Sequence, residues 1–202
     1  MSKKIMGNEG PTLGISSSLE MFEKLKHESS LLVESWSPYD TFNFLVTGWH
    51  LFQDWPKSDL AGSLSRKKRN RRDLPKSMNL ILDVVRDLVN GSKHFKLDRK
   101  SSEKRRVGEV HTGKEVGFYE YFFHEDIPAV TVEDHWYFSI RVLNNILLGY
   151  FEWVFNDDVP LDEFPDELEQ GILFCNIAKR DVSKKPKLFY QGMEKTRHTH
   201  RK

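Results

Sequence analysis

Four polar residues near the middle of the chain are the best candidates for chemistry. Arg86, Asn90, Lys93 and His94 lie within a single short stretch. Arginine and lysine bind phosphate groups, an asparagine amide can orient a phosphate, and histidine can transfer a proton near neutral pH. Cleavage of RNA or transfer of a nucleotide requires these roles. We therefore predict that the four residues form a catalytic site.

A helix over residues 77–95 has to position these side chains. Its apolar residues fall on one face of a helix with 3.6 residues per turn, and its polar residues, including Arg86 and Asn90, fall on the opposite face. Ser77 is the expected N-cap, and Gly91 either ends the helix or lies inside it. The polar face is either a working surface or the ordinary solvated side of an amphipathic helix, which is the commoner case.

Two basic runs flank this helix. The first contains Arg66, Lys67, Lys68, Arg69, Arg71 and Arg72, and the second contains Lys96, Arg99, Lys100, Lys104, Arg105 and Arg106. No packed face can hold so many like charges, so we expect the first run to be solvated. Such runs either improve solubility or contact phosphates. Apart from Lys96, we predict all of these residues as nucleic-acid-binding.

Composition indicates one globular domain. The chain has 202 residues, of which 30% are charged and 38% hydrophobic, and its 14 phenylalanines are too many for global disorder. The net charge of +1 hides a segregation of signs along the chain. Cys175 is the only cysteine, so an intrachain disulfide cannot form. We predict a cytoplasmic protein that needs neither a metal nor a cofactor.

The most apolar long window, residues 136–155, is predicted as a core helix. It carries Arg141, Asn144, Asn145 and Glu152, which a lone membrane span would not tolerate. The first residues contain no apolar segment of the length that a secretory signal requires. We therefore expect no membrane partner.

The chain divides into three parts. Residues 1–15 are predicted as a flexible leader, residues 16–181 as a single helical domain, and residues 182–202 as a basic tail. We expect helices at 16–34, 39–55, 77–95, 134–156 and 170–181. Strands at 107–111, 115–123 and 128–133 form a predicted antiparallel meander. The acidic residues 157–169 are expected to be a solvated linker or an internal partner for the basic runs, rather than a clamp for a divalent cation.

The segment with Arg86, the polar Asp87 and then His94 resembles the HEPN superfamily of small helical bundles. Seven residues separate Arg86 from His94, an interval longer than the usual motif of that family. The resemblance implies a helical bundle. Together with the strand pattern at about 107–133, it predicts a mainly α fold, a HEPN-like helical bundle with a small inserted antiparallel β-meander. It also implies metal-independent RNA cleavage, usually across a symmetric homodimer and often in defence or toxin systems.

Two functions therefore compete, beside a third possibility, a purely structural or scaffold protein. The first is an RNA-acting protein, a metal-independent endoribonuclease in which Arg86 stabilises charge on the phosphate and His94 is the general acid or base. The second is a non-catalytic module that binds nucleic acid or a protein partner through its basic runs.

Overall fold

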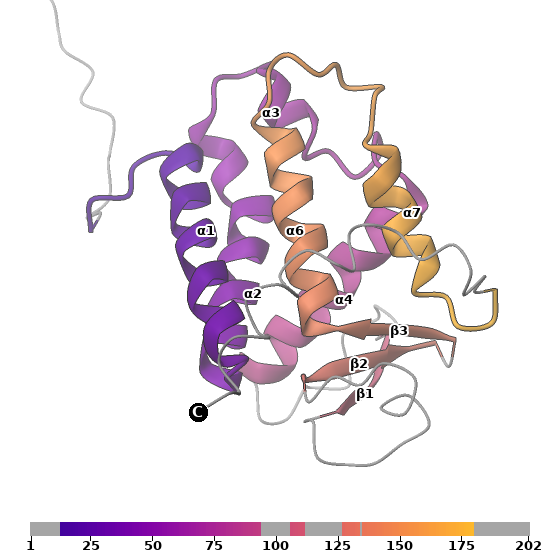
Figure 1. Ribbon diagram of the computed structural model, residues 1–202. Coiled ribbons are helices and arrows are strands. Elements are labelled where there is room, and N and C mark those ends of the chain that lie inside the picture. The colour runs from indigo at the N-terminus through magenta and orange to yellow at the C-terminus, as the bar shows by residue number, and fades with distance from the viewer. Residues whose placement is uncertain (1–12, 94–105, 112–126, 134, 180–202) are drawn as a thin grey trace, which may run out of the picture.

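The computed structural model describes residues 13–93, 106–111, 127–133 and 135–179 (Figure 1). The fold is mainly α with a small antiparallel sheet, as the sequence predicts. The predicted strand at 115–123 and the basic tail lie outside the described residues, as does most of the predicted leader. Among the described residues, no helix combines the length and the apolar character that a membrane crossing requires.

Helices α1 (Ser18–Ser35) and α2 (Pro38–Gln53) form a hairpin close to the predicted boundaries. Ser17 and Glu20 form a capping box at the start of α1, and Ser37 caps α2 with Pro38 in its first turn. Trp36 joins the two helices in a left-handed conformation with φ of 50°. Serine caps and a proline in the local sequence thus determine where the two helices begin.

The other helices pack around this hairpin. They are the short η1 (Trp55–Ser58) and α3 (Leu64–Lys67), then α4 (Lys76–Lys93), α6 (Ile140–Val154) and α7 (Asp166–Phe174). Fully buried side chains from α1, α2, α4 and α6 form one continuous core, among them Leu25, Phe44, Ile81, Leu143 and Phe151. The core therefore holds α4 against both the hairpin and the C-terminal half of the chain.

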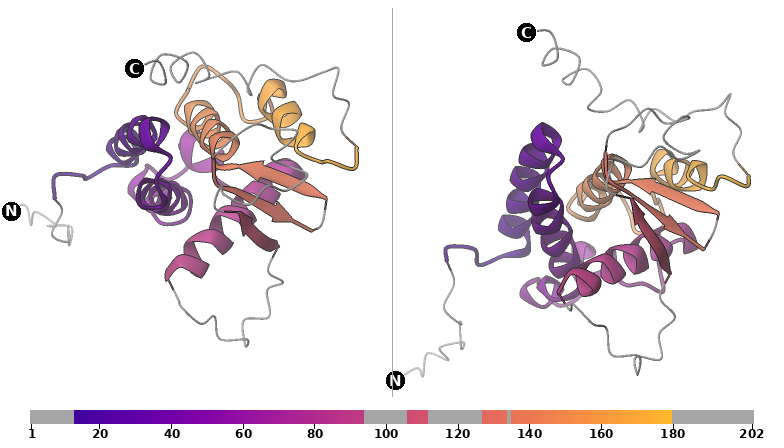
Figure 2. Two further views of the ribbon diagram at one scale, coloured as in Figure 1. Left: turned by 60° about the horizontal axis from the view of Figure 1, so that its bottom comes forward. Right: turned by 90° about the horizontal axis from the view of Figure 1, so that it is seen from below.

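The sheet lies at one end of this helical body (Figures 1 and 2). Strands β1 (Val107–His111), β2 (Ala129–Val132) and β3 (Trp136–Ser139) pair antiparallel in the order β1-β2-β3. The backbone N–H of Tyr137 donates to the carbonyl of Cys175 at 3.0 Å, so the chain after α7 runs beside β3. The sheet therefore joins the end of α7 to the start of α6.

Two predicted helices have wrong boundaries. The predicted helix at 134–156 begins only at Ile140, because residues 136–139 pair with β2 and Ser139 caps α6. The predicted helix at 170–181 begins earlier, at Asp166, and ends at Phe174. Acidic residues in the first turn favour this earlier start, since a helix N-terminus carries a partial positive charge.

Candidate functional site

Helix α4 is continuous through Gly91 to Lys93. Arg86 and Asn90 therefore lie one turn apart on the same face, and each is partly buried. Lys93 is the last residue of the helix, and the structure does not describe its side chain. His94 lies outside the described residues. The geometry thus aligns two of the four predicted catalytic residues.

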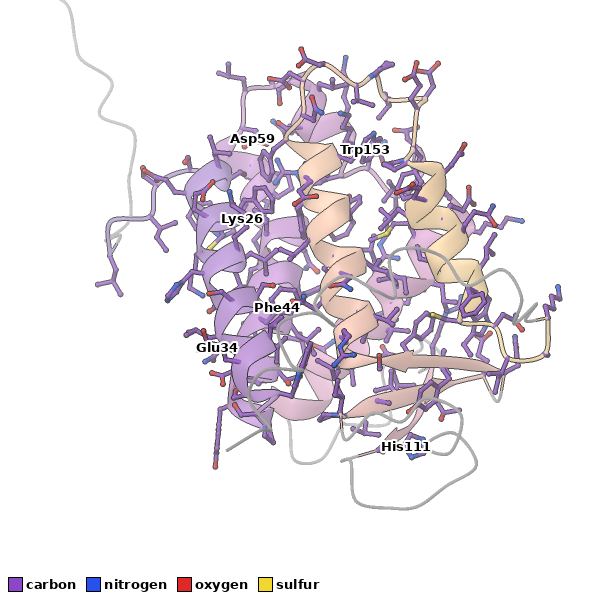
Figure 3. The ribbon with its side chains drawn as sticks, viewed as in Figure 1. Lys26, Glu34, Phe44, Asp59, His111 and Trp153 are labelled. Carbon is purple, nitrogen blue, oxygen red and sulfur yellow. The ribbon has the colours of Figure 1, made fainter. Side chains whose placement is uncertain are left out.

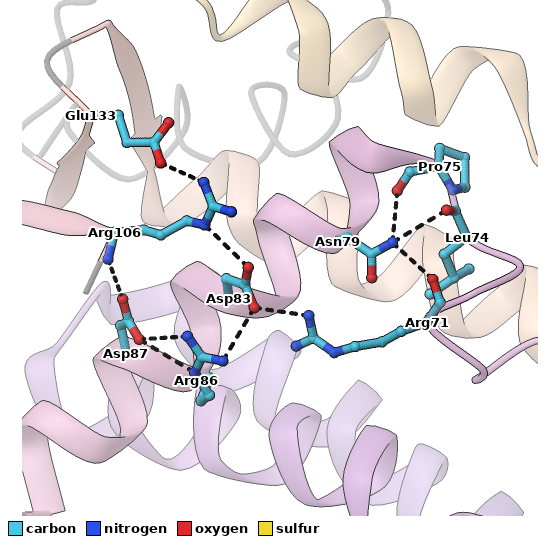
Figure 4. Close-up of polar contacts among 9 residues, drawn as sticks. All are labelled: Arg71, Leu74, Pro75, Asn79, Asp83, Arg86, Asp87, Arg106 and Glu133. Carbon is cyan, nitrogen blue, oxygen red and sulfur yellow. Dashed lines mark hydrogen bonds and ion pairs between the residues drawn. The ribbon is translucent and has the colours of Figure 1, made fainter. Parts of the chain in front are cut away.

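Arg86 lies between two carboxylates of its own helix (Figure 4). Its guanidinium is 3.4 Å from Asp83 Oδ1 and 3.3 Å from Asp87 Oδ1. Only 19% of its side chain is exposed. The polar face of α4 near Arg86 is therefore an ion-pair network and not a row of freely solvated charges.

Arginines from two other segments complete this network. Arg71 Nη1 is 2.8 Å from Asp83 Oδ1, and Arg106 Nε is 3.1 Å from Asp83 Oδ2. Arg106 also pairs with Glu133, which follows β2. Burial alone would lower the pKa of Arg106, but its contacts with Glu133 and Asp83 outweigh burial and raise it. The network therefore ties the loop before α4 and the sheet to α4.

Asp87 holds the start of β1. Its Oδ2 accepts a hydrogen bond from the backbone N–H of Arg106 at 2.6 Å and a longer one from Val107 at 3.5 Å. Only 9% of Asp87 is exposed, so the carboxylate satisfies buried backbone donors. The three described arginines of this network face three carboxylates, and their formal charges cancel. This balance makes the network a structural joint and weakens its attraction for a phosphate.

The expectation that the whole first basic run is solvated is wrong for two of its residues. Lys68 is fully buried and Arg69 is 5% exposed. Lys68 Nζ donates to the carbonyls of Trp153 and Asn156 at 2.8 and 2.7 Å, and lies 4.8 Å from the centre of the Trp153 ring. Trp153 lies in the last turn of α6 and Asn156 follows that helix, so the ammonium lies at a helix C-terminus, where a cation is favoured. Burial lowers the pKa of Lys68, and the charge of Asp157 opposes this shift.

Arg69 has a separate set of internal partners. It pairs with Asp59 and donates to the carbonyl of Leu51 at 3.0 Å and to Ser18 Oγ at 3.2 Å. Burial lowers its pKa to about 10. Asp59 and Trp153, the partners of this arginine and of Lys68, lie at the same end of the molecule (Figure 3). Lys68 and Arg69 therefore anchor the loop before α4, and neither is available to bind nucleic acid.

The remaining cations of the first basic run differ in whether they have a partner. Arg71 pairs with Asp83 and lies over the Phe52 ring, 5.5 Å from its centre. Arg66, Lys67 and Arg72 are exposed, and no side-chain contact joins them to another residue in the described part of the chain. Of the second basic run only Arg106 is described. Lys96, Arg99, Lys100, Lys104 and Arg105 lie outside the described residues.

The comparisons with known proteins add no relative. No protein-family model, no curated protein and no solved structure matches this chain. The site must be interpreted from its own geometry. That geometry separates two surfaces, the charge-balanced network around Arg86 and the three exposed cations of the first basic run.

Proposed function

We propose that this protein is a non-catalytic nucleic-acid-binding module that contacts the phosphate backbone through Arg66, Lys67 and Arg72. The observation that carries the proposal is that the first basic run contains both buried and exposed cations. Its buried pair, Lys68 and Arg69, fixes the loop to α6 and to the α1–α2 hairpin. The three cations around that pair are exposed and have no described partner.

This arrangement favours a polyanion for two reasons. Unpaired exposed cations lose little when they exchange solvent for phosphate. Each cation that neutralises a phosphate also releases a counterion from the nucleic acid, and this release adds to affinity. The anchored backbone also reduces the conformational entropy that binding would otherwise cost. Contacts of this kind are made to phosphates and not to base edges, so they carry little sequence preference.

Salt dependence of RNA binding tests the proposal. Fluorescence anisotropy with a labelled single-stranded RNA would be measured over a range of salt concentrations for the full chain and for an Arg66→Gln, Lys67→Gln, Arg72→Gln triple variant. For single strands the slope of log K against log salt is about −0.7 per phosphate contact, so the variant should lose about 2 units of slope.

A matched control removes three other exposed lysines. Lys26, Lys57 and Lys179 lie on α1, on η1 and after α7. Changing them to glutamine alters the net charge equally and should leave the slope unchanged. Equal losses in the two triple variants, or no binding by the native chain at low salt, would refute the assignment. Binding to an acidic protein but not to RNA would also refute it.

A metal-independent ribonuclease, as the HEPN resemblance implies, is the second candidate. The observation in its favour is the continuity of α4 past Gly91, which aligns Arg86 with Asn90. It ranks second because Asp83 and Asp87 balance the charge of Arg86. Cleavage of RNA in the presence of a chelator, abolished in a folded His94→Ala variant, would support it. Sedimentation would show whether a homodimer forms.

A further inference from the structure

A cavity lies between α6 and the segment that leads into α7. Its volume is about 750 Å³, within the usual range for ligand-binding clefts. Helix α6 contributes Asn145, Gly149, Glu152 and Trp153, Asn156 follows that helix, and the facing wall contains residues from the range 159–168. The lining residues with apolar side chains are Trp153, Val159, Phe164, Pro165 and Leu168.

The walls of this cavity are held by specific contacts. The Trp153 and Phe164 rings meet edge to face at 5.2 Å between centres, and Trp153 Nε1 donates to the carbonyl of Glu163 at 2.9 Å. A Cβ on Gly149 would lie 3.3 Å from Leu168 Cδ1, so glycine there lets α7 approach α6 closely. The cavity is therefore part of the packed structure.

Among the described residues, the lining carries charge of one sign only. It contains no lysine or arginine and five carboxylates, those of Glu152, Asp162, Glu163, Asp166 and Glu167. Within the described residues none of the five has an ion-pair partner. The Lys68 ammonium lies over the Trp153 ring, so this ring already contacts one cation inside the fold. Aromatic walls with unpaired carboxylates suit the aliphatic stem and charged end of lysine.

We propose that this cavity binds the basic segment 182–202 of the same chain. That segment contains seven lysines and arginines and a single glutamate, and Leu188, Phe189 and Tyr190 follow its first lysines. Its charge is opposite to that of the cavity, and its apolar residues match the aromatic walls. The proposal is independent of nucleic-acid binding by Arg66, Lys67 and Arg72.

The segment after Lys179 is long enough to reach the cavity. The described chain ends at Lys179, five residues after the last residue of α7, and the first turn of α7 lines the cavity. A nine-residue helix is about 14 Å long, whereas the 23 residues that follow Lys179 could span up to about 75 Å. Tethering also gives the segment an effective concentration in the millimolar range.

Zero-length cross-linking of the full chain tests the proposal. A carbodiimide joins a carboxylate to a lysine amine only when the two are in direct contact. Peptide mass spectrometry of the monomer should find Lys184, Lys185 or Lys187 linked to Asp166 or Glu167. Mixing ¹⁴N-labelled and ¹⁵N-labelled chains distinguishes links within one chain from links between two chains. Links should be lost in high salt, because exposed ion pairs are screened.

Matched variants make the test specific. Replacing Glu152, Asp162 and Glu163 by their amides should lower the yield of links to Asp166 and Glu167 at least about fivefold, since each lost carboxylate weakens the attraction. The amide variants of Glu23, Glu34 and Asp73, which lie elsewhere on the surface, should not change the yield. Links only between chains, equal links to Glu23 and Glu34, or no links at all would overturn the proposal.

Discussion

Replacing Lys68 by methionine should destabilise the protein, whereas the same change at the neighbouring Lys67 should not. Methionine keeps most of the apolar stem but removes the two hydrogen bonds to the carbonyls of Trp153 and Asn156. Hydrogen bonds from charged groups contribute about 1.5–3 kcal/mol each. Lys67 is exposed and has no described side-chain partner, so its change should fall within about 0.5 kcal/mol.

The net effect is smaller than the sum of the lost bonds. Burying an ammonium costs several kcal/mol, and Lys68→Met recovers that cost. The carbonyl of Asn156 loses this partner, which costs about 1–3 kcal/mol if the group stays buried, whereas the carbonyl of Trp153 still accepts from the backbone N–H of Asn156 at 3.3 Å. We expect a net loss of about 2 kcal/mol in the free energy of unfolding, which corresponds to a melting temperature about 4–8 °C lower for a domain of this size.

Urea unfolding followed by circular dichroism, with calorimetry for the melting temperature, measures this difference. The slope of unfolding free energy against urea should stay the same in both variants, because the exposed surface is unchanged. If Lys68→Met is as stable as Lys67→Met, or more stable than the native chain, the two hydrogen bonds do not offset the cost of burying the amine. The interpretation of Lys68 as an anchor would then be wrong.

Three further predictions concern other contacts. Hydrogen bonds, chiefly from the backbone N–H of Ser16, lower the pKa of Glu20 below 4.5. The contribution of Glu20 to stability is therefore present above pH 4.5 and lost as the pH falls through the lowered pKa. The difference in melting temperature between the native chain and Glu20→Gln should shrink in acid, and a constant difference would contradict this. The free energy of unfolding of Asp87→Ala, measured in urea, should be about 2–4 kcal/mol lower, because the backbone N–H groups of Arg106 and Val107 lose their acceptor. A loss below about 0.5 kcal/mol would show that Asp87 does not hold the start of β1. Gly149→Val should lose about 1–3 kcal/mol by forcing Leu168 away, measured in the same way, and unchanged stability would show that the α6–α7 contact is loose.

Local sequence signals predicted α1, α2 and α4 well, but not the bounds of α6 and α7. Ser37 followed by Pro38 marks the start of α2, and the apolar periodicity of residues 77–95 marks α4 within two residues at each end. These signals act over a few residues, so they can be recognised without knowledge of the fold. The pairing of Asp83 with Arg86 is of the same kind, because residues three apart on a helix are neighbours.

Features that depend on distant residues could not be predicted in this way. Lys68 is buried by carbonyls 85 and 88 residues later in the chain, and nothing near it in sequence distinguishes it from Lys67. Residues 136–139 pair with β2, although their apolar run is equally compatible with a helix. The role of Asp87 at the start of β1 also depends on a contact across 19 residues.

The segregation of charge along this chain serves helix ends as well as surfaces. Lys68 lies at the C-terminus of α6, where the helix dipole favours a cation, and Asp166 and Glu167 lie in the first turn of α7, where it favours anions. A basic or acidic run therefore cannot be equated with a binding surface. Only the residues of such a run that remain exposed and unpaired are available to a partner. In the first basic run these residues are Arg66, Lys67 and Arg72.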